Sequence, residues 1–179
     1  NNVFKDFVTS QNTEHHYGVT AGNSDSAKTI KNITITNNEF KNLKTEAADR
    51  WMNAIIAFDD STGNDARVEN LSITDNVVHD ISGVSTGNAW AQGIVVGAPS
   101  NATVEDNVIY DISGGTLNFG IKVGIHSVDV DLTGNEIYNV DTSGMLIDAS
   151  TDITENDIYN NAQGIRLFSD AGAGRKIKN

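Results

Sequence analysis

Apolar and polar residues alternate in short segments along the whole chain, and these segments recur in a fixed order. The first segment of a repeat reads like NITIT from Asn32 or NLSIT from Asn70. Apolar residues at every second position predict a strand with one buried face. The positions expected to point inward are Ile33, Ile35, Leu71, Ile73, Ala102, Val104, Val130, Leu132, Thr151 and Ile153.

The alternating segments lead into a seven-residue phrase built around an asparagine. Its six copies are NNVFKDF from Asn1, NNEFKNL from Asn37, DNVVHDI from Asp75, DNVIYDI from Asp106, GNEIYNV from Gly134 and ENDIYNN from Glu155. Apolar residues two and five positions after the asparagine predict a second strand, and only Asn161 breaks this pattern. The shared asparagines are Asn2, Asn38, Asn76, Asn107, Asn135 and Asn156.

A third strand signal follows, usually opened by a glycine, as in GIVV from Gly93 and GIKV from Gly120. The second repeat has AIIAF from Ala54 instead. In that repeat, residues 45–58 would also suit a helix with Thr45 as its N-cap. Alignment with the other copies favours a loop over residues 44–53 and a strand over residues 54–58.

A unit of three short strands cannot bury its apolar face alone, so successive units must stack. Parallel strands joined by crossovers take the right-handed path. The sequence therefore predicts an all-β fold, a right-handed parallel β-helix of about six coils with three short strands per coil. Residues 1–179 are interpreted as a single β-helix domain, a segment of a longer solenoid whose flanking coils would be partners.

The repeated asparagine suits a tight turn, because asparagine tolerates left-handed backbone and its side chain can pair buried amides. Stacked in register, these side chains are expected to form a structural ladder. A second Asx ladder and an outward-pointing stack should lie beside it. Their members are Asp6, Asn42, Asp80, Asp111, Asn139 and Asn160, and Lys5, Lys41, His79, Tyr110, Tyr138 and Tyr159.

Composition narrows the set of partners. The 179 residues carry a net charge of −12, which disfavours nucleic acid and anionic membrane surfaces. No apolar run reaches the length of a membrane span. The chain has no cysteine, so a disulfide framework is excluded. An anionic polysaccharide stays possible, because a local basic stripe or a bound cation could offset the charge.

These phrases resemble the parallel β-helix repeats of the pectin-lyase-like superfamily over nearly the whole chain. The resemblance implies an extracellular or cell-surface setting and an acidic polysaccharide as partner. Enzyme motifs of the superfamily are missing: Pro99 is the only proline, so an Asp-Pro-His-Glu motif is absent, and Asp59-Asp60 lacks the companions of a hydrolase pair. Enzymatic activity is therefore left open.

Three functions remain. The favoured one is a rigid scaffold with a polysaccharide-binding surface. The alternatives are part of a polysaccharide lyase, hydrolase or epimerase, and a tailspike or appendage segment. On the outer face of the glycine strands, Lys122, Arg166 and Asp148 are the candidate catalytic residues. A solvated face with a cross-strand salt bridge is the plainer and preferred interpretation of these charges.

Aromatic residues mark the same strands. Trp51 and Trp90 occupy equivalent places, and Tyr17 and Phe119 lie immediately before a glycine, so the four could stack against sugars. Equally, they could seal long loops against the barrel. The apolar Ile56 and Val95 are expected to point outward and be exposed, which suggests that something covers this face.

No metal ligand set is predicted, because the histidines lack the spacing of a metal site. Aspartates in loops make Ca²⁺ possible without a binding motif. The loop aspartates in question are Asp25, Asp59, Asp60 and Asp65.

Overall fold

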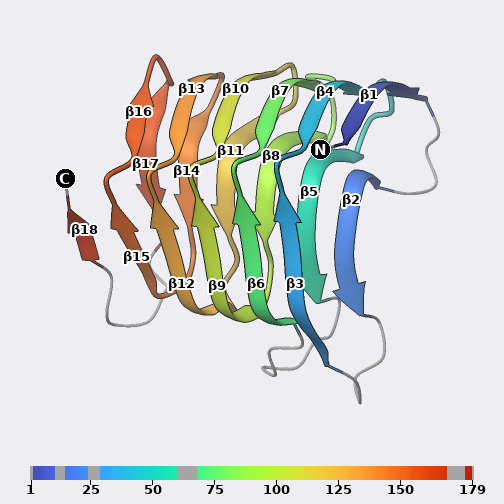
Figure 1. Ribbon diagram of the computed structural model, residues 1–179. Coiled ribbons are helices and arrows are strands. Elements are labelled where there is room, and N and C mark those ends of the chain that lie inside the picture. Colours follow the sequence, from blue (N-terminus) through green and yellow to red (C-terminus); the bar gives the residue numbers. More distant parts are fainter. Residues whose placement is uncertain (1, 11–14, 24–28, 60–67, 169–175, 179) are drawn as a thin grey trace.

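The chain winds into a solenoid of three parallel sheets, seen in a computed structural model that describes residues 2–10, 15–23, 29–59, 68–168 and 176–178 (Figure 1). Sheet A contains β1 Val3–Thr9, β4 Glu39–Thr45, β7 Val77–Ser82, β10 Val108–Ser113, β13 Glu136–Val140 and β16 Asp157–Tyr159. Sheet B contains β2 His16–Asn23, β5 Trp51–Asp59, β8 Trp90–Val96, β11 Leu117–Val123, β14 Ser143–Ile147 and β17 Gln163–Leu167. Sheet C contains β3 Ile30–Thr36, β6 Val68–Thr74, β9 Pro99–Glu105, β12 Val128–Thr133, β15 Thr151–Thr154 and β18 Lys176–Lys178.

Each winding passes from sheet C to sheet A and then to sheet B, and equivalent residues pair in register. Ile109 in β10 pairs with Val78 on one side and Ile137 on the other. Ile94 in β8 pairs with Ile55 and with Ile121. The predicted parallel β-helix with three strands per coil is thus confirmed, and residues far apart in the chain become vertical neighbours.

The core fills the inside of the solenoid with one layer of apolar side chains per coil. Phe40, Ile55, Ile73 and Ile109 are fully buried in it. At the two ends the same positions are only partly buried, as for Phe4 in the first coil. Stacking of neighbouring coils therefore buries this layer, as expected for a repeat that cannot fold alone.

The corner between sheets C and A always consists of two residues, and the structure corrects their expected roles. The first residue adopts the left-handed conformation, with φ between 52° and 65° in each described copy. The ladder asparagine is the second residue and has no positive φ. The left-handed residues at this corner are Asn37, Asp75, Asp106, Gly134 and Glu155.

The side chain of the ladder asparagine instead forms hydrogen bonds to the coils on either side. Asn107 Nδ2 donates to the carbonyl oxygens of Ile73 and Glu105, at 2.9 and 3.0 Å, and to Asn135 Oδ1 at 3.0 Å. Asn107 Oδ1 accepts from the backbone and side-chain nitrogens of Asn76, both at 3.0 Å. The same pattern links Asn2 to Asn38 and continues to Asn156. The ladder thus ties each corner to its neighbours.

Residues 45–58 contain no helix, as alignment of the copies favoured. The bounds of the expected loop over residues 44–53 are wrong, because β4 reaches Thr45 and β5 begins at Trp51, before the expected start at Ala54. The exception at Asn161 also has a structural reason. Asn161 Oδ1 accepts from Val140 N–H at 2.8 Å, and its Nδ2 donates to Ile137 O at 3.1 Å. The side-chain amide replaces the backbone pairing that is lost because β16 ends at Tyr159.

Candidate binding face on sheet B

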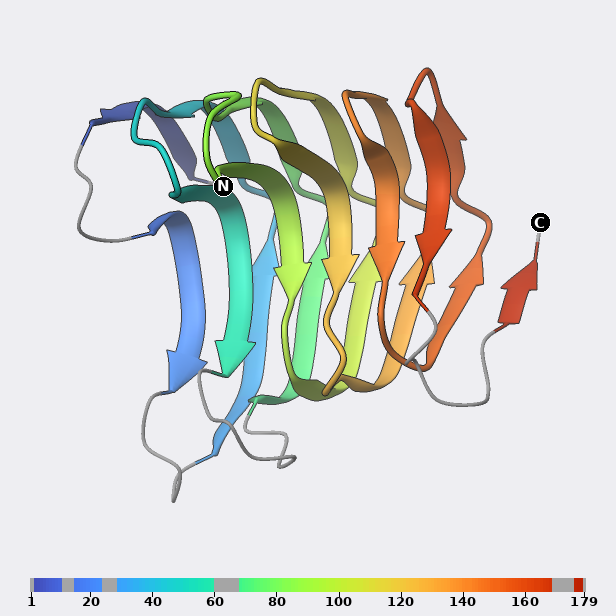
Figure 2. The ribbon, with the colours of Figure 1, turned by 180° about the vertical axis from the view of Figure 1, so that it is seen from behind.

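The outer face of sheet B gathers the candidate site residues, and Figure 2 views the molecule with this sheet toward the reader. In β5, Met52, Ala54, Ile55 and Ala57 belong to the core. The remaining side chains, Trp51, Asn53 and Ile56, therefore point outward. Two consecutive inward residues interrupt the alternation at the glycine-type position. At Gly93 a Cβ would meet Ile109 Cγ2 at 2.9 Å, which explains why most coils have glycine there.

Two rows of side chains run across this face from coil to coil. The first row is here called the amide row after its three amide side chains. It consists of residues that pair in register from strand to strand: Tyr17, Asn53, Gln92, Phe119, Ser143 and Gln163. The second, the cation row, lies three residues further along each strand: Thr20, Ile56, Val95, Lys122, Leu146 and Arg166. Sequence reasoning anticipated the cation row, and the structure places Lys122 and Arg166 two coils apart in it.

The expectation that Ile56 and Val95 are exposed is wrong. Ile56 is 4% and Val95 5% exposed, and Phe119 and Leu146 are buried as well. None of these four residues belongs to the interior core. They form a second apolar layer on the outside of the sheet. Water therefore has little access to these four side chains, although they lie on the outer face of sheet B.

Trp51 and Trp90 stack on each other along the solenoid, with ring centroids 4.6 Å apart and an interplanar angle of 8°. His15 stacks on Trp51 at 4.3 Å, and Phe119 meets Trp90 edge-on at 6.1 Å. His15 and Trp90 lie in the coils before and after Trp51. Stacking therefore uses both faces of Trp51 and one face of Trp90. Phe119 and Lys122 contact Trp90 from the next coil, so any sugar would mainly meet the ring edges. Tyr17 lies one coil from Asn53 in the amide row.

The two indoles are held differently. Trp51 Nε1 donates to Asn88 O at 3.1 Å, and the Trp51 backbone N–H donates to His15 Nδ1 at 3.2 Å. Trp90 Nε1 is buried without a hydrogen-bond partner among the described residues. Trp51 is therefore anchored on two sides, whereas ring contacts hold the Trp90 indole.

The cations of this face each engage an aromatic ring. Lys122 Nζ lies 4.7 Å from the centroid of Trp90 and 6.0 Å from that of Trp51. The Arg166 guanidinium lies 4.7 Å from the ring of Phe168. Desolvation by burial lowers the pKa of Lys122, and the Asp148 carboxylate, just after β14, opposes this shift to a smaller extent. Lys122 is thus an amine that loses its proton more readily than an exposed lysine.

Sequence reasoning missed the amides of this face. Asn53 Oδ1 and Nδ2 and Gln92 Nε2 are buried, and like Trp90 Nε1 they have no hydrogen-bond partner in the part of the chain that the structure describes. An unpaired buried polar atom costs about 1–3 kcal/mol, so a cluster of them is unusual. A signal existed in the sequence, since Asn53 and Gln92 each directly precede the glycine-type residue. It was overlooked because neither residue type suggests chemistry by itself.

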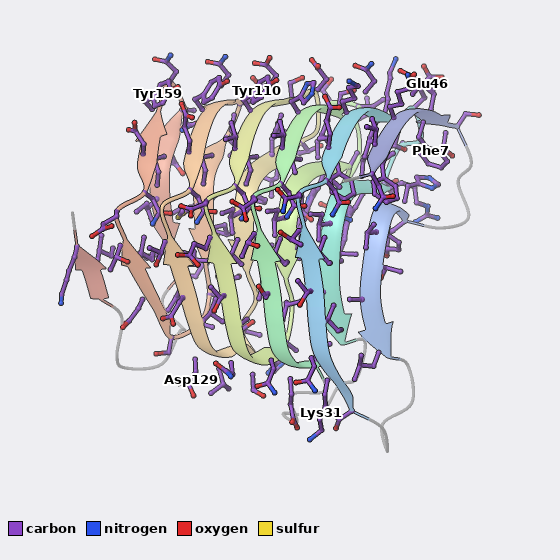
Figure 3. All side chains as sticks on the ribbon, viewed as in Figure 1. Phe7, Lys31, Glu46, Tyr110, Asp129 and Tyr159 are labelled. Atoms are coloured by element: carbon purple, nitrogen blue, oxygen red, sulfur yellow. The ribbon has the colours of Figure 1, made fainter. Side chains whose placement is uncertain are left out.

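The outer face of sheet A carries the expected stack of rings, with Tyr110 and Tyr159 labelled at its outer edge in Figure 3. The Tyr110–Tyr138 and Tyr138–Tyr159 centroids are each 5.0 Å apart. Tyr159 Oη donates to Glu136 Oε1 at 2.7 Å, which raises the pKa of Tyr159 to about 12. The described residues contain no group of three or more acidic or histidine side chains suited to a metal ion. Asp25, Asp60 and Asp65 lie outside the described residues.

Three in-register sheets around one apolar interior define the class of this protein as a right-handed parallel β-helix. The chain belongs to the family described as right handed beta helix region, which matches residues 1–178. No curated protein and no solved structure matches the chain. Among the described residues there is no helix that is long and apolar enough to cross a membrane.

Proposed function

We propose that this β-helix is a rigid scaffold that binds a polysaccharide along the outer face of sheet B. The observation that carries the proposal is the combination on one face of two cations, an aromatic pair and buried amides. Lys122 and Arg166 lie in one row, and Trp51 and Trp90 lie beside it. Strands about 4.8 Å apart present these groups in a straight line, which suits an extended chain of sugars.

The charge of this face favours an acidic polysaccharide over a neutral one. The whole chain carries −12, yet the cation row contains Lys122 and Arg166 and no carboxylate. Both cations lie over aromatic rings, so they are partly shielded from water and would interact strongly with a uronate. Ion pairing of this kind weakens as salt is added.

The test is a titration with oligogalacturonate and with a neutral galactan of equal length, followed by calorimetry at two salt concentrations. We expect the uronate to bind more tightly than the galactan, and added salt to weaken its binding. Lys122→Met or Arg166→Met should reduce the affinity about tenfold, the worth of one charged hydrogen bond. Lys5→Met, which removes an exposed lysine of sheet A, is the matched control. Equal affinities for all variants would contradict the proposal.

A second candidate is a lyase, because the pKa of Lys122 is lowered. A neutral amine beside a uronate could remove the proton next to the carboxylate, with Arg166 neutralising the carboxylate and Asp148 placing the lysine. The unsaturated product absorbs in the ultraviolet, so turnover is read directly, with and without Ca²⁺. Lys122→Gln should abolish it. Binding without any absorbance change would leave the scaffold function and exclude the lyase.

The same proposal includes an extracellular or cell-surface setting and stacking of further coils. Terminal coils expose apolar side chains, with Phe7 48% and Ile177 50% exposed, and a further coil would bury them. Unpaired strand edges are ready to pair with another strand. Light scattering over a range of protein concentrations tests this stacking: association should rise with concentration, and a strictly monomeric protein would argue against it.

A further inference from the structure

Four polar atoms on the outer face of sheet B are buried and have no hydrogen-bond partner among the described residues, and they form one cluster on neighbouring positions of β5 and β8. Asn53 contributes Oδ1 and Nδ2, Gln92 contributes Nε2 and Trp90 contributes Nε1, and each atom exposes less than 1 Å². Asn53 and Gln92 pair in register, and Trp90 lies two residues before Gln92. The ladder asparagines show what an amide does when it supports this fold: Asn107 takes part in several hydrogen bonds. Asn53 Oδ1, Asn53 Nδ2 and Gln92 Nε2 make no such bond to the described residues.

Apolar side chains line the amides of the cluster, and the Lys122 ammonium lies on the Trp90 side, 4.7 Å from the ring centroid. Ile56 and Val95 lie in the neighbouring row, and Phe119 follows Gln92 in the amide row; all three are buried. An ionised group placed against them would lose its hydration at a high cost. A neutral group that combines hydrogen bonds with an apolar end fits this lining better.

The unpaired atoms comprise three donors and one acceptor. An acetamido group has a carbonyl oxygen that can accept two hydrogen bonds, one N–H and a methyl group. Its carbonyl would accept from Gln92 Nε2 and Trp90 Nε1, and its N–H would donate to Asn53 Oδ1. Asn53 Nδ2 would then donate to a neighbouring sugar hydroxyl. The methyl group would pack on the apolar layer, so every unpaired atom finds a partner.

We propose that Asn53, Gln92 and the Trp90 indole form a subsite for the acetamido group of an N-acetylated sugar. The inference rests on the proposed function and names the kind of sugar unit that the face selects. The Trp90 side chain is the gate of this subsite. Ring contacts hold it, whereas Trp51 is anchored by hydrogen bonds, so rotation of Trp90 opens the amides to a ligand.

The two tryptophans make the test direct, because a ¹H–¹⁵N spectrum shows only two indole N–H signals. The probes are methyl N-acetyl-β-glucosaminide and methyl β-glucoside, which differ in the acetamido group. We expect the N-acetylated glycoside, and not the plain glycoside, to shift the Trp90 signal and the Asn53 amide signals. The Trp51 signal should move with them, because its ring stacks on that of Trp90. No shift, or equal shifts with both glycosides, would overturn the subsite.

Asn53→Leu separates a binding role from a structural one. The variant keeps the branching and the number of side-chain heavy atoms and removes the unpaired amide. We therefore expect it to fold about as stably and to bind the N-acetylated glycoside about tenfold or more weakly. Gln163→Leu, an exposed member of the same row, is the matched control and should bind normally. A lower melting temperature with unchanged binding would show that the amide is structural, paired through a buried water, and would overturn the inference.

Polymers distinguish this inference from the proposed function. A hyaluronan octasaccharide carries alternating uronate and acetamido units, and an octagalacturonate carries uronate alone. If hyaluronan binds more tightly than octagalacturonate, and Asn53→Leu removes only this difference in affinity, both the subsite and the polysaccharide-binding function are supported. If both polymers bind equally and the variant changes nothing, the subsite falls and the scaffold function remains. If neither polymer binds while the monosaccharide still shifts Trp90, the subsite remains and the polysaccharide function falls.

Discussion

Removal of one ladder asparagine from the middle of the solenoid should destabilise the fold severely. Asn107→Ala deletes a side chain that is fully buried and takes part in five hydrogen-bond contacts. The buried N–H of Asn76 loses its acceptor, which costs about 1–3 kcal/mol, and the carbonyl of Ile73 loses a donor, which costs about 1 kcal/mol. Glu105 O keeps a second donor, Asp75 N–H. When the remaining contacts of Asn107 are included, the free energy of unfolding should fall by about 3–5 kcal/mol.

The matched control is Asn2→Ala at the end of the same ladder. Asn2 is exposed, and to the described residues its side chain makes one hydrogen bond, to Asn38 Oδ1 at 3.1 Å. Its loss should cost less than about 1 kcal/mol. Urea unfolding followed by circular dichroism compares the two variants, and hydrogen exchange at the Asn76 amide reports the local effect. If the free energies of unfolding of the two variants differ by less than about 1 kcal/mol, the ladder does not stabilise the fold by linking its coils.

Three further predictions concern the ends and faces of the solenoid. Gly93→Ala should lower the free energy of unfolding by about 1–3 kcal/mol, because the new Cβ would lie 2.6 Å from the backbone oxygen of Gly120 in the next coil. At Gly164 the nearest atom to such a Cβ is 3.9 Å away, so Gly164→Ala should leave the thermal unfolding nearly unchanged. Asn161→Val restores the apolar residue of the other copies yet should destabilise the protein by about 1–2 kcal/mol, because two backbone groups lose their partners; an increase in stability would contradict this. Absorbance titration should show Tyr159 ionising near pH 12, and Glu136→Gln should lower this pKa. Because the folded-state pKa is raised, the contribution of Tyr159 to stability is present below pH of about 10 and is lost as the pH rises toward about 12.

Much of the fold followed from the periodicity of the sequence. Alternation of apolar residues, as at Leu71 and Ile73, identified the strands, and the six phrases identified their stacking. One error, the start of β5, and one exception to the pattern, Asn161, came from contacts that no single repeat contains. The start of β5 at Trp51 depends on pairing with Trp90, and the amide at Asn161 works only because a strand above it needs a partner. Register between coils, rather than local preference, decided both.

The sequence predicted where the candidate site lies. It did not predict which of its side chains are buried, stacked or without a hydrogen-bond partner. Sequence spacing placed Lys122 and Arg166 in one row and Trp51 beside Trp90, because residues of equivalent phase in a repeat must align when the repeats stack. Spacing could not show that Ile56 is covered, that ring stacking uses both faces of Trp51, or that Asn53 lacks a partner. Those properties depend on side chains that meet from different coils. The chain alone therefore determined which residues share a face, and the tertiary packing decided which of them water or a ligand can reach.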